Sequence, residues 1–135
     1  MTTISPIGVL LVDDQQATLW GLGQLIEGEW PHMSVAGKAC DRETALRLAV
    51  TAKPDVILLD LDLDGESSLD LLPELFAVCQ AQVLVCTCLR DRYLHEQALR
   101  DGACGVVLKD GPAALLLEAI TMAYQRRSAS TAKLL

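Results

Sequence analysis

Short apolar runs alternate with longer helical patterns five times along this sequence. Each run is nearly free of charged residues, which is typical of a strand buried on both faces of a parallel sheet. The predicted strands are residues 7–12, 33–38, 56–59, 82–87 and 105–108. After each run, apolar residues recur at the three- and four-residue spacing of an amphipathic helix. The pattern therefore predicts five strand–helix units.

Polar residues and one proline predict where three of these helices begin. Asp41 and Asp91 each stand just before a helical pattern and suit an N-terminal cap. Ser67, with Asp70 three residues later, indicates a variant of the capping box. Pro73 follows, so we expect a kink or a later start in that helix.

Strands that alternate with helices favour the α/β class. We expect a three-layer (βα)5 fold with a parallel five-stranded sheet and helices on both faces. The length of 135 residues is typical of one domain. The last helix is predicted from Ala113 to about Arg126. We therefore expect a domain over residues 1–127, and a tail or linker stub over residues 128–135.

Composition and charge exclude several classes of protein. The sequence is 51% hydrophobic and 21% charged, so an intrinsically disordered chain is excluded. The net charge of −7 argues against a large nucleic-acid contact by these residues. No apolar run approaches the roughly 20 residues of a membrane span. We expect a soluble, cytoplasmic protein with no membrane contact.

Five cysteines are present, and their spacing contains no C-x-x-C motif. We interpret them as small buried residues in a reducing compartment rather than metal ligands. They are Cys40, Cys79, Cys86, Cys88 and Cys104.

The polar residues with chemical potential follow the predicted strands. Asp13 and Asp14 follow the first strand and Asp60 follows the third. Thr87 closes the fourth strand and Lys109 follows the fifth. In an open parallel sheet these strand ends lie on one edge, where α/β proteins bind ligands. Further acids near strand ends, Asp55, Asp62 and Asp64, add to the negative charge.

These residue types at one edge suit a magnesium ion and phosphoryl transfer. Grouped carboxylates repel each other, and Mg²⁺ relieves that repulsion by binding oxygen ligands. Asp14, Asp60 and one backbone carbonyl would supply protein ligands. Asp60 would act as the nucleophile and form an aspartyl phosphate. Thr87 and Lys109 would contact the transferred group.

Four segments resemble the receiver domain of bacterial two-component response regulators. They stand in the expected order, and the resemblance extends from Ile7 to about Tyr124. The segments are VLLVDD (residues 9–14), PDVILLDLDL (54–63), VLVCT (83–87) and GACGVVLKD (102–110). The last segment is most similar to the NarL/FixJ-type subgroup.

The resemblance implies a strand order of 2-1-3-4-5 and a role for each site residue. Asp60 accepts phosphate from a sensor histidine kinase. Asp14 binds Mg²⁺ directly, Asp13 binds it through water, and the backbone carbonyl of Asp62 is the third protein ligand. Thr87 and Lys109 contact the phosphate.

The resemblance also implies partners. Subgroup members usually carry a C-terminal helix-turn-helix domain, so DNA would be bound by that output domain and not by the receiver. The face of the fourth helix, fifth strand and fifth helix is the usual output surface, and a homodimer could form through it. Such a protein is a signalling phosphoacceptor that catalyses only its own phosphorylation and dephosphorylation.

Four positions depart from the usual receiver pattern. Val106 stands where many receivers have an aromatic switch residue, so a switch must use other contacts. Cys88 replaces a smaller residue and is expected to narrow access to the phosphate. Asp62 adds a carboxylate that could alter the phosphate lifetime. Asp64-Gly65 replaces Pro-Gly, so we expect a looser loop.

Two other functions compete with a phosphorylation switch. The first is a receiver-like adaptor that docks partners without phosphate, which the Val106 departure favours and the intact acidic set opposes. The second is an ordinary α/β enzyme or nucleotide-binding protein. The sequence lacks the glycine-rich motifs that cradle nucleotide phosphates, which argues against it.

Overall fold

A parallel sheet of five strands forms the centre of the protein. The computed structural model describes residues 5–134. The sheet contains β1 (Ile7–Val12), β2 (Met33–Ala39), β3 (Val56–Leu59), β6 (Gln82–Thr87) and β7 (Gly105–Leu108). Its order is β2-β1-β3-β6-β7, and all four neighbouring pairs are parallel. The expected α/β fold and its 2-1-3-4-5 order are confirmed.

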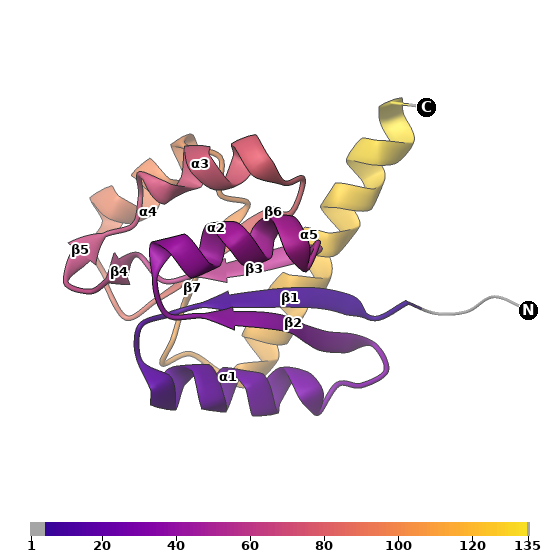
Figure 1. The fold of residues 1–135 in the computed structure, drawn as a ribbon, viewed down its shortest axis with the longest axis horizontal. Helices are drawn as coiled ribbons and strands as arrows, with labels where there is room; N and C mark the ends of the chain where they lie inside the picture. Colours follow the sequence, from indigo (N-terminus) through magenta and orange to yellow (C-terminus); the bar gives the residue numbers. More distant parts are fainter. Residues whose placement is uncertain (1–4, 135) are drawn as a thin grey trace, which may run out of the picture.

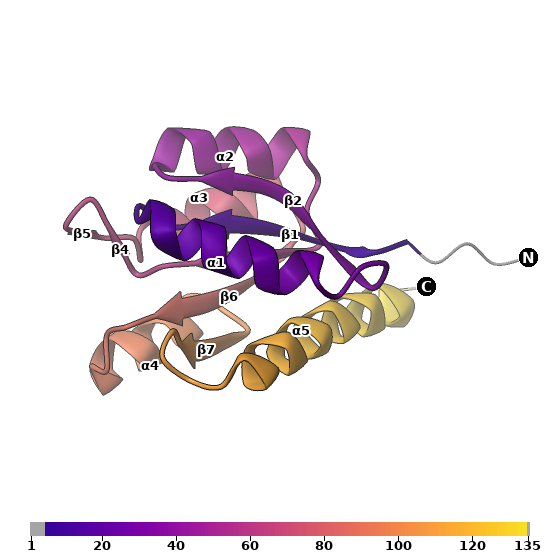
Figure 2. The ribbon, with the colours of Figure 1, turned by 90° about the horizontal axis from the view of Figure 1, so that it is seen from below.

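Helices cover both faces of the sheet, as Figures 1 and 2 show. The helices are α1 (Gln16–Glu27), α2 (Arg42–Thr51), α3 (Leu71–Val78), α4 (Arg92–Arg100) and α5 (Ala113–Leu134). Val9 and Leu11 pack in a core with residues of α1 and α5. Leu10 and Val12 point the other way, into a core with α2, α3 and α4. Alternate side chains of one apolar strand thus fill both cores.

Two helix caps agree with the sequence prediction and one does not. The carboxylate of Asp41 accepts a hydrogen bond from Thr44 N at 2.8 Å. Asp91 accepts one from Tyr93 N at 2.9 Å. The predicted capping box at Ser67 and Asp70 is wrong, because Ser67 belongs to a short strand and Asp70 makes no side-chain cap. The helix begins only at Leu71, as the proline predicted, with that proline in its first turn.

The segment after β3 is a hairpin, and the expectation that its loop is looser stays a prediction. Strand β4 (Asp62–Leu63) pairs antiparallel with β5 (Glu66–Ser67). The two residues between them, Asp64 and Gly65, have φ values of 54° and 76°. Asp-Gly is the dipeptide that favours such a two-residue turn, since both positions need a left-handed backbone.

The last helix is longer than the sequence predicted. It continues to Leu134, so the end expected near Arg126 is wrong and residues 128–134 are helical. Arg127 fastens this helix to the sheet, because it donates to Asp55 Oδ1 at 2.7 Å and to Gln80 O at 3.2 Å. A domain boundary at residue 128 stays a prediction.

The cysteines do not all have the buried environment that we expected. Cys86 is buried, but Cys40 and Cys88 are exposed and Cys79 and Cys104 are half-buried. Burial raises the pKa of the Cys86 thiol to about 11, which keeps it protonated at neutral pH. Among the described residues, no helix is long and apolar enough to span a bilayer.

We predict that Gly102→Ala lowers the free energy of unfolding by about 1–2 kcal/mol, because a side chain is strained at positive φ. Gly102 has a φ of 112°, and a Cβ there would lie 2.7 Å from Cε2 of Phe76. Gly21→Ala in α1 is the control, since a Cβ there meets nothing within 4 Å. Urea denaturation should show this control unchanged or more stable. Equal stability of Gly102→Ala and the unmodified protein would contradict the prediction.

Candidate functional site

Side chains from three strands meet at the carboxyl edge of the sheet. Asp13 follows β1, Asp60 follows β3, and Lys109 follows β7. Lys109 Nζ lies 2.9 Å from Asp60 Oδ2 and also forms an ion pair with Asp13 Oδ2. The predicted convergence of these distant residues is therefore found.

Three carboxylates at this edge lie close enough together to hold a metal ion. Asp13, Asp14 and Asp60 each offer an oxygen within 4.8 Å of the others. At 4 Å and an effective dielectric of 20, one such pair repels by about 4 kcal/mol. Lys109 brings one positive charge against three negative charges. The site therefore retains an excess of negative charge that a hard divalent cation would neutralise.

The hydrogen bonds of the acids also fit a metal ion. Asp13 Oδ1 accepts from Gln15 N at 2.9 Å, and its buried Oδ2 is paired with the ammonium of Lys109. Asp14 Oδ2 accepts from Asp64 N at 3.0 Å. Oxygen donors with unused lone pairs are the ligands that Mg²⁺ takes in proteins.

A hollow of about 110 Å³ opens above the acids. Its lining includes Asp14, Asp60, Asp62, Thr87, Cys88 and Lys109. Asp62 N donates to Asp60 Oδ1 at 3.3 Å, and the Asp62 side chain is exposed. The hollow thus brings the predicted phosphate contacts beside the predicted nucleophile, whereas the role of the Asp62 carbonyl stays a prediction.

Thr87 is fully buried and bonds within its own loop. Its Oγ1 accepts a hydrogen bond from Leu89 N at 3.1 Å. Because the hydroxyl acts as an acceptor in this bond, its hydrogen is still available to a ligand. The residue is in the predicted place, but the residues described here show no hydrogen bond from it to Asp60.

Burial and pairing shift the pKa values of the central pair. Desolvation raises the pKa of Asp60, and the nearby Lys109 opposes that shift only in part. Burial acts to lower the pKa of Lys109, but its contacts with Asp13 and Asp60 outweigh burial and raise it. Lys109 is therefore a cation at neutral pH, and it favours the ionised form of Asp60.

Sequence reasoning missed two contacts and misplaced one acid. Ser68 is buried and donates from Oγ to the backbone carbonyl of Asp60, a role that no local pattern revealed. The bond from Asp64 N to Asp14 depends on the hairpin, which the Asp-Gly turn could have indicated. Asp55 precedes β3 and lies at the opposite edge, where it binds Gly8 N and Arg127, so it is not part of the acidic group.

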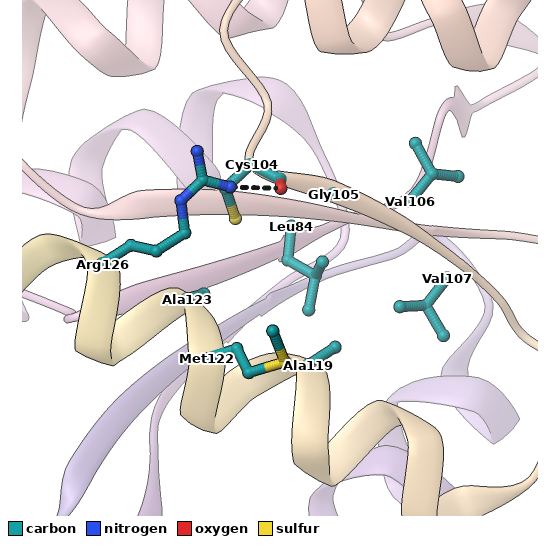
Figure 3. A pocket seen from close by; sticks show the side chains of 9 residues that line it. All are labelled: Leu84, Cys104, Gly105, Val106, Val107, Ala119, Met122, Ala123 and Arg126. Carbon is teal, nitrogen blue, oxygen red and sulfur yellow. Dashed lines mark hydrogen bonds between the residues drawn. The ribbon is translucent and has the colours of Figure 1, made fainter.

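A second hollow, of about 150 Å³, lies between β7 and α5 (Figure 3). Its lining is mostly apolar and includes Leu84, Val107 and Met122. Arg126 NH1 donates to Cys104 O at 3.0 Å beside it. It contains none of the predicted site residues. The acidic edge is the candidate site because the predicted residues meet there.

A sequence profile of the response regulator receiver domain matches residues 9–121 of this chain. The chain belongs to the response regulator receiver family. In this receiver, five polar residues at strand ends lie together at one edge of the sheet: Asp13, Asp14, Asp60, Thr87 and Lys109. The assignment rests on a match over most of the chain.

The similarity to known relatives supports the assignment to the NarL/FixJ-type subgroup. The receiver is 39% identical to the nitrate/nitrite response regulator protein NarP of Escherichia coli K12 over 122 residues, 89% of this chain and 56% of NarP. It is 32% identical to the transcriptional regulatory protein LiaR of Bacillus subtilis over 118 residues, 87% of this chain and 56% of LiaR. The receiver thus spans little more than half the length of these relatives.

A solved structure shows the same architecture. A LuxR-family two-component response regulator from Aurantimonas matches with a TM-score of 0.83 and 29% identity. The match covers 91% of this receiver and 88% of that chain.

We predict that Mg²⁺ raises the midpoint of thermal unfolding and that Asp14→Asn removes most of this effect. A ligand at ten times its dissociation constant stabilises the folded state by about 1.4 kcal/mol. Asp101→Asn, at the end of α4, is the control and should keep the full response. Calorimetry with and without Mg²⁺ measures the shift of the unfolding midpoint for Asp14→Asn and for the control. An identical response of Asp14→Asn and the control would exclude Asp14 as a ligand.

Proposed function

We propose that this receiver is a phosphorylation switch and that Asp60 accepts the phosphoryl group from the phosphohistidine of a sensor histidine kinase. The contact of Lys109 Nζ with both Asp60 and Asp13 carries the proposal. It places a fixed positive charge beside a buried carboxylate that opens onto a hollow. Such a pair suits transfer of an anionic group to an oxygen nucleophile.

In the transfer, an Asp60 carboxylate oxygen forms a bond to phosphorus. The bond between phosphorus and the histidine nitrogen breaks, and its electron pair stays on the imidazole. Lys109 stabilises the negative charge of the transferring group, and the protein acts mainly by positioning. The raised pKa of Lys109 keeps this residue charged throughout.

The acidic residues would hold Mg²⁺ in the roles that the resemblance implies. Asp14 and Asp60 would bind it directly, Asp13 through water, and Asp62 through its backbone carbonyl. When bound, Mg²⁺ supplies positive charge to the phosphoryl oxygens. The close approach of the three carboxylates supports this assignment.

The signal would leave the site through Thr87. Donation of its hydroxyl hydrogen to a phosphoryl oxygen would draw the residue toward Asp60 and disturb its bond to Leu89 N. The loop after β6 leads directly into α4, and Arg90 in that loop pairs with Asp110 in the loop after β7. Phosphate would bias two pre-existing states of this region.

In a longer protein the receiver would control a C-terminal helix-turn-helix domain that binds DNA. The relatives named as transcriptional regulators, and their greater length, support this part of the proposal. The face of α4, β7 and α5 is the proposed output surface and the proposed site of a homodimer. Exposed apolar side chains on its two helices, among them Tyr93, Leu99, Leu115 and Met122, suit such a contact.

We predict that the receiver gains one phosphoryl group from acetyl phosphate in the presence of Mg²⁺ and that Asp60→Asn gains none. Mass spectrometry measures the gain, and Asp101→Asn is the control that should be phosphorylated at the normal rate. If the unmodified protein gains no phosphoryl group, the result would favour the alternative function, a receiver-like adaptor that docks partners without phosphate.

We also predict that beryllofluoride, a phosphate mimic, changes amide hydrogen exchange over residues 90–108. Thr87→Ala should still bind the mimic but lose most of this change, since the hydroxyl is the link to the loop. Residues 42–51 of α2 provide an internal control and should be unaffected. Identical exchange over residues 90–108 with and without the mimic would disprove the proposed route.

A further inference from the structure

Ser68 is a buried residue between the hairpin and α3, and each of its polar groups is bonded. Its Oγ donates to the carbonyl of Asp60 at 2.5 Å. Its N–H donates to Leu61 O at 2.8 Å, and its own carbonyl accepts from Leu71 N at 2.9 Å. None of its surface is exposed. Ser68 therefore fixes the chain that returns from the hairpin directly against the predicted nucleophile.

The backbone of Asp60 is held from two sides by these contacts. Its N–H donates to Val12 O at 3.0 Å, which ties it to the end of β1. The Ser68 hydroxyl holds the carbonyl on the other side of the same residue. The two bonds together restrict φ and ψ, so they set the direction in which the Asp60 side chain leaves the backbone.

The hairpin that delivers Ser68 is itself anchored. Arg42 NH2 donates to the carbonyl of Ser67 at 2.6 Å, and Arg42 NH1 pairs with Asp70 at 2.8 Å. At the turn, Asp64 N donates to Asp14 Oδ2. This short segment thus contacts two of the three clustered acids. It reaches Asp60 through the Ser68 side chain and Asp14 through the backbone N–H of Asp64.

We propose that Ser68 is a positioning residue for Asp60: its hydroxyl bond to the Asp60 carbonyl aims the carboxylate at Lys109 and the metal site. The inference rests on the proposed function, because it assigns Ser68 to the reaction of Asp60. Ser68 itself does not touch the transferred group. It acts by holding the nucleophile in the geometry that binds the cation and accepts phosphate.

The test compares Ser68→Ala with Ser67→Ala in two measurements made well below the unfolding temperature. The first is Mg²⁺ affinity by calorimetric titration, and the second is the rate constant of phosphorylation by acetyl phosphate. We expect Ser68→Ala to weaken Mg²⁺ binding and to slow phosphorylation, each roughly three- to tenfold, the effect of one lost hydrogen bond. Ser67→Ala should match the unmodified protein, since the only hydrogen bond of Ser67 Oγ among the described residues comes from Leu69 N.

Rescue separates positioning from a purely structural role. Ser68→Cys keeps a donor of similar size but weaker strength, so both quantities should lie between those of Ser68→Ala and the unmodified protein. If Ser68→Ala does not fold, Ser68→Cys alone must weaken Mg²⁺ binding and slow phosphorylation. A variant that is only less stable, with unchanged Mg²⁺ affinity and rate constant in its folded form, would overturn the proposal.

Failure of the proposed function is a separate outcome. If the unmodified protein binds Mg²⁺ but is not phosphorylated, the assignment of Asp60 as phosphoacceptor fails. Ser68 is then judged by Mg²⁺ affinity alone, and equal affinity of Ser68→Ala and the unmodified protein overturns its positioning role.

Discussion

One lysine ammonium holds together carboxylates that would otherwise repel each other at the edge of the sheet. Lys109 contacts Asp13 and Asp60, and both acids are buried. Burial destabilises the charge on Asp60, as its raised pKa indicates, so this carboxylate depends on nearby positive charge. A single lysine cannot balance three acids. The remaining negative charge would attract a cation, and the lysine would attract an anionic group.

The parallel sheet brings these charges together by register rather than by any local motif. Val12 pairs with Leu59, so Asp13 and Asp60 follow neighbouring positions on adjacent strands. Thr87 pairs with Leu108, and Lys109 N donates to Thr87 O at 2.9 Å, which fixes the start of the lysine side chain. At the opposite edge, Asp55 binds Gly8 N and Arg127 and so ties α5 to the sheet. Polar contacts thus stabilise both edges of a sheet whose central residues are apolar.

The sheet and most of the site were predictable because buried parallel strands are continuous apolar runs and the reactive residues follow them directly. The strands of the β4–β5 hairpin are too short to show an alternation of apolar and polar residues. Only the Asp-Gly dipeptide at its turn could have indicated a hairpin. The role of Ser68 depends on the path of the chain through that hairpin, which no spacing reveals. Asp55 was misplaced because it was grouped by nearness to a strand alone, although it precedes residues 56–59 and so belongs to the opposite edge of a parallel sheet. The end of α5 was misjudged because a polar composition is compatible with continued helix.

The half-buried Val106 constrains how a switch can work in this receiver. It lies on β7 opposite Val85, where a branched aliphatic side chain has no ring to rotate into a new position. Thr87 is tied through Leu89 N to the loop before α4, and Arg90 links that loop to Asp110 beyond β7. In the proposed switch, movement of Thr87 toward a phosphoryl group would be transmitted by the loop backbone and this surface ion pair. Because an exposed ion pair contributes little free energy, the Arg90–Asp110 contact would oppose the proposed movement only weakly.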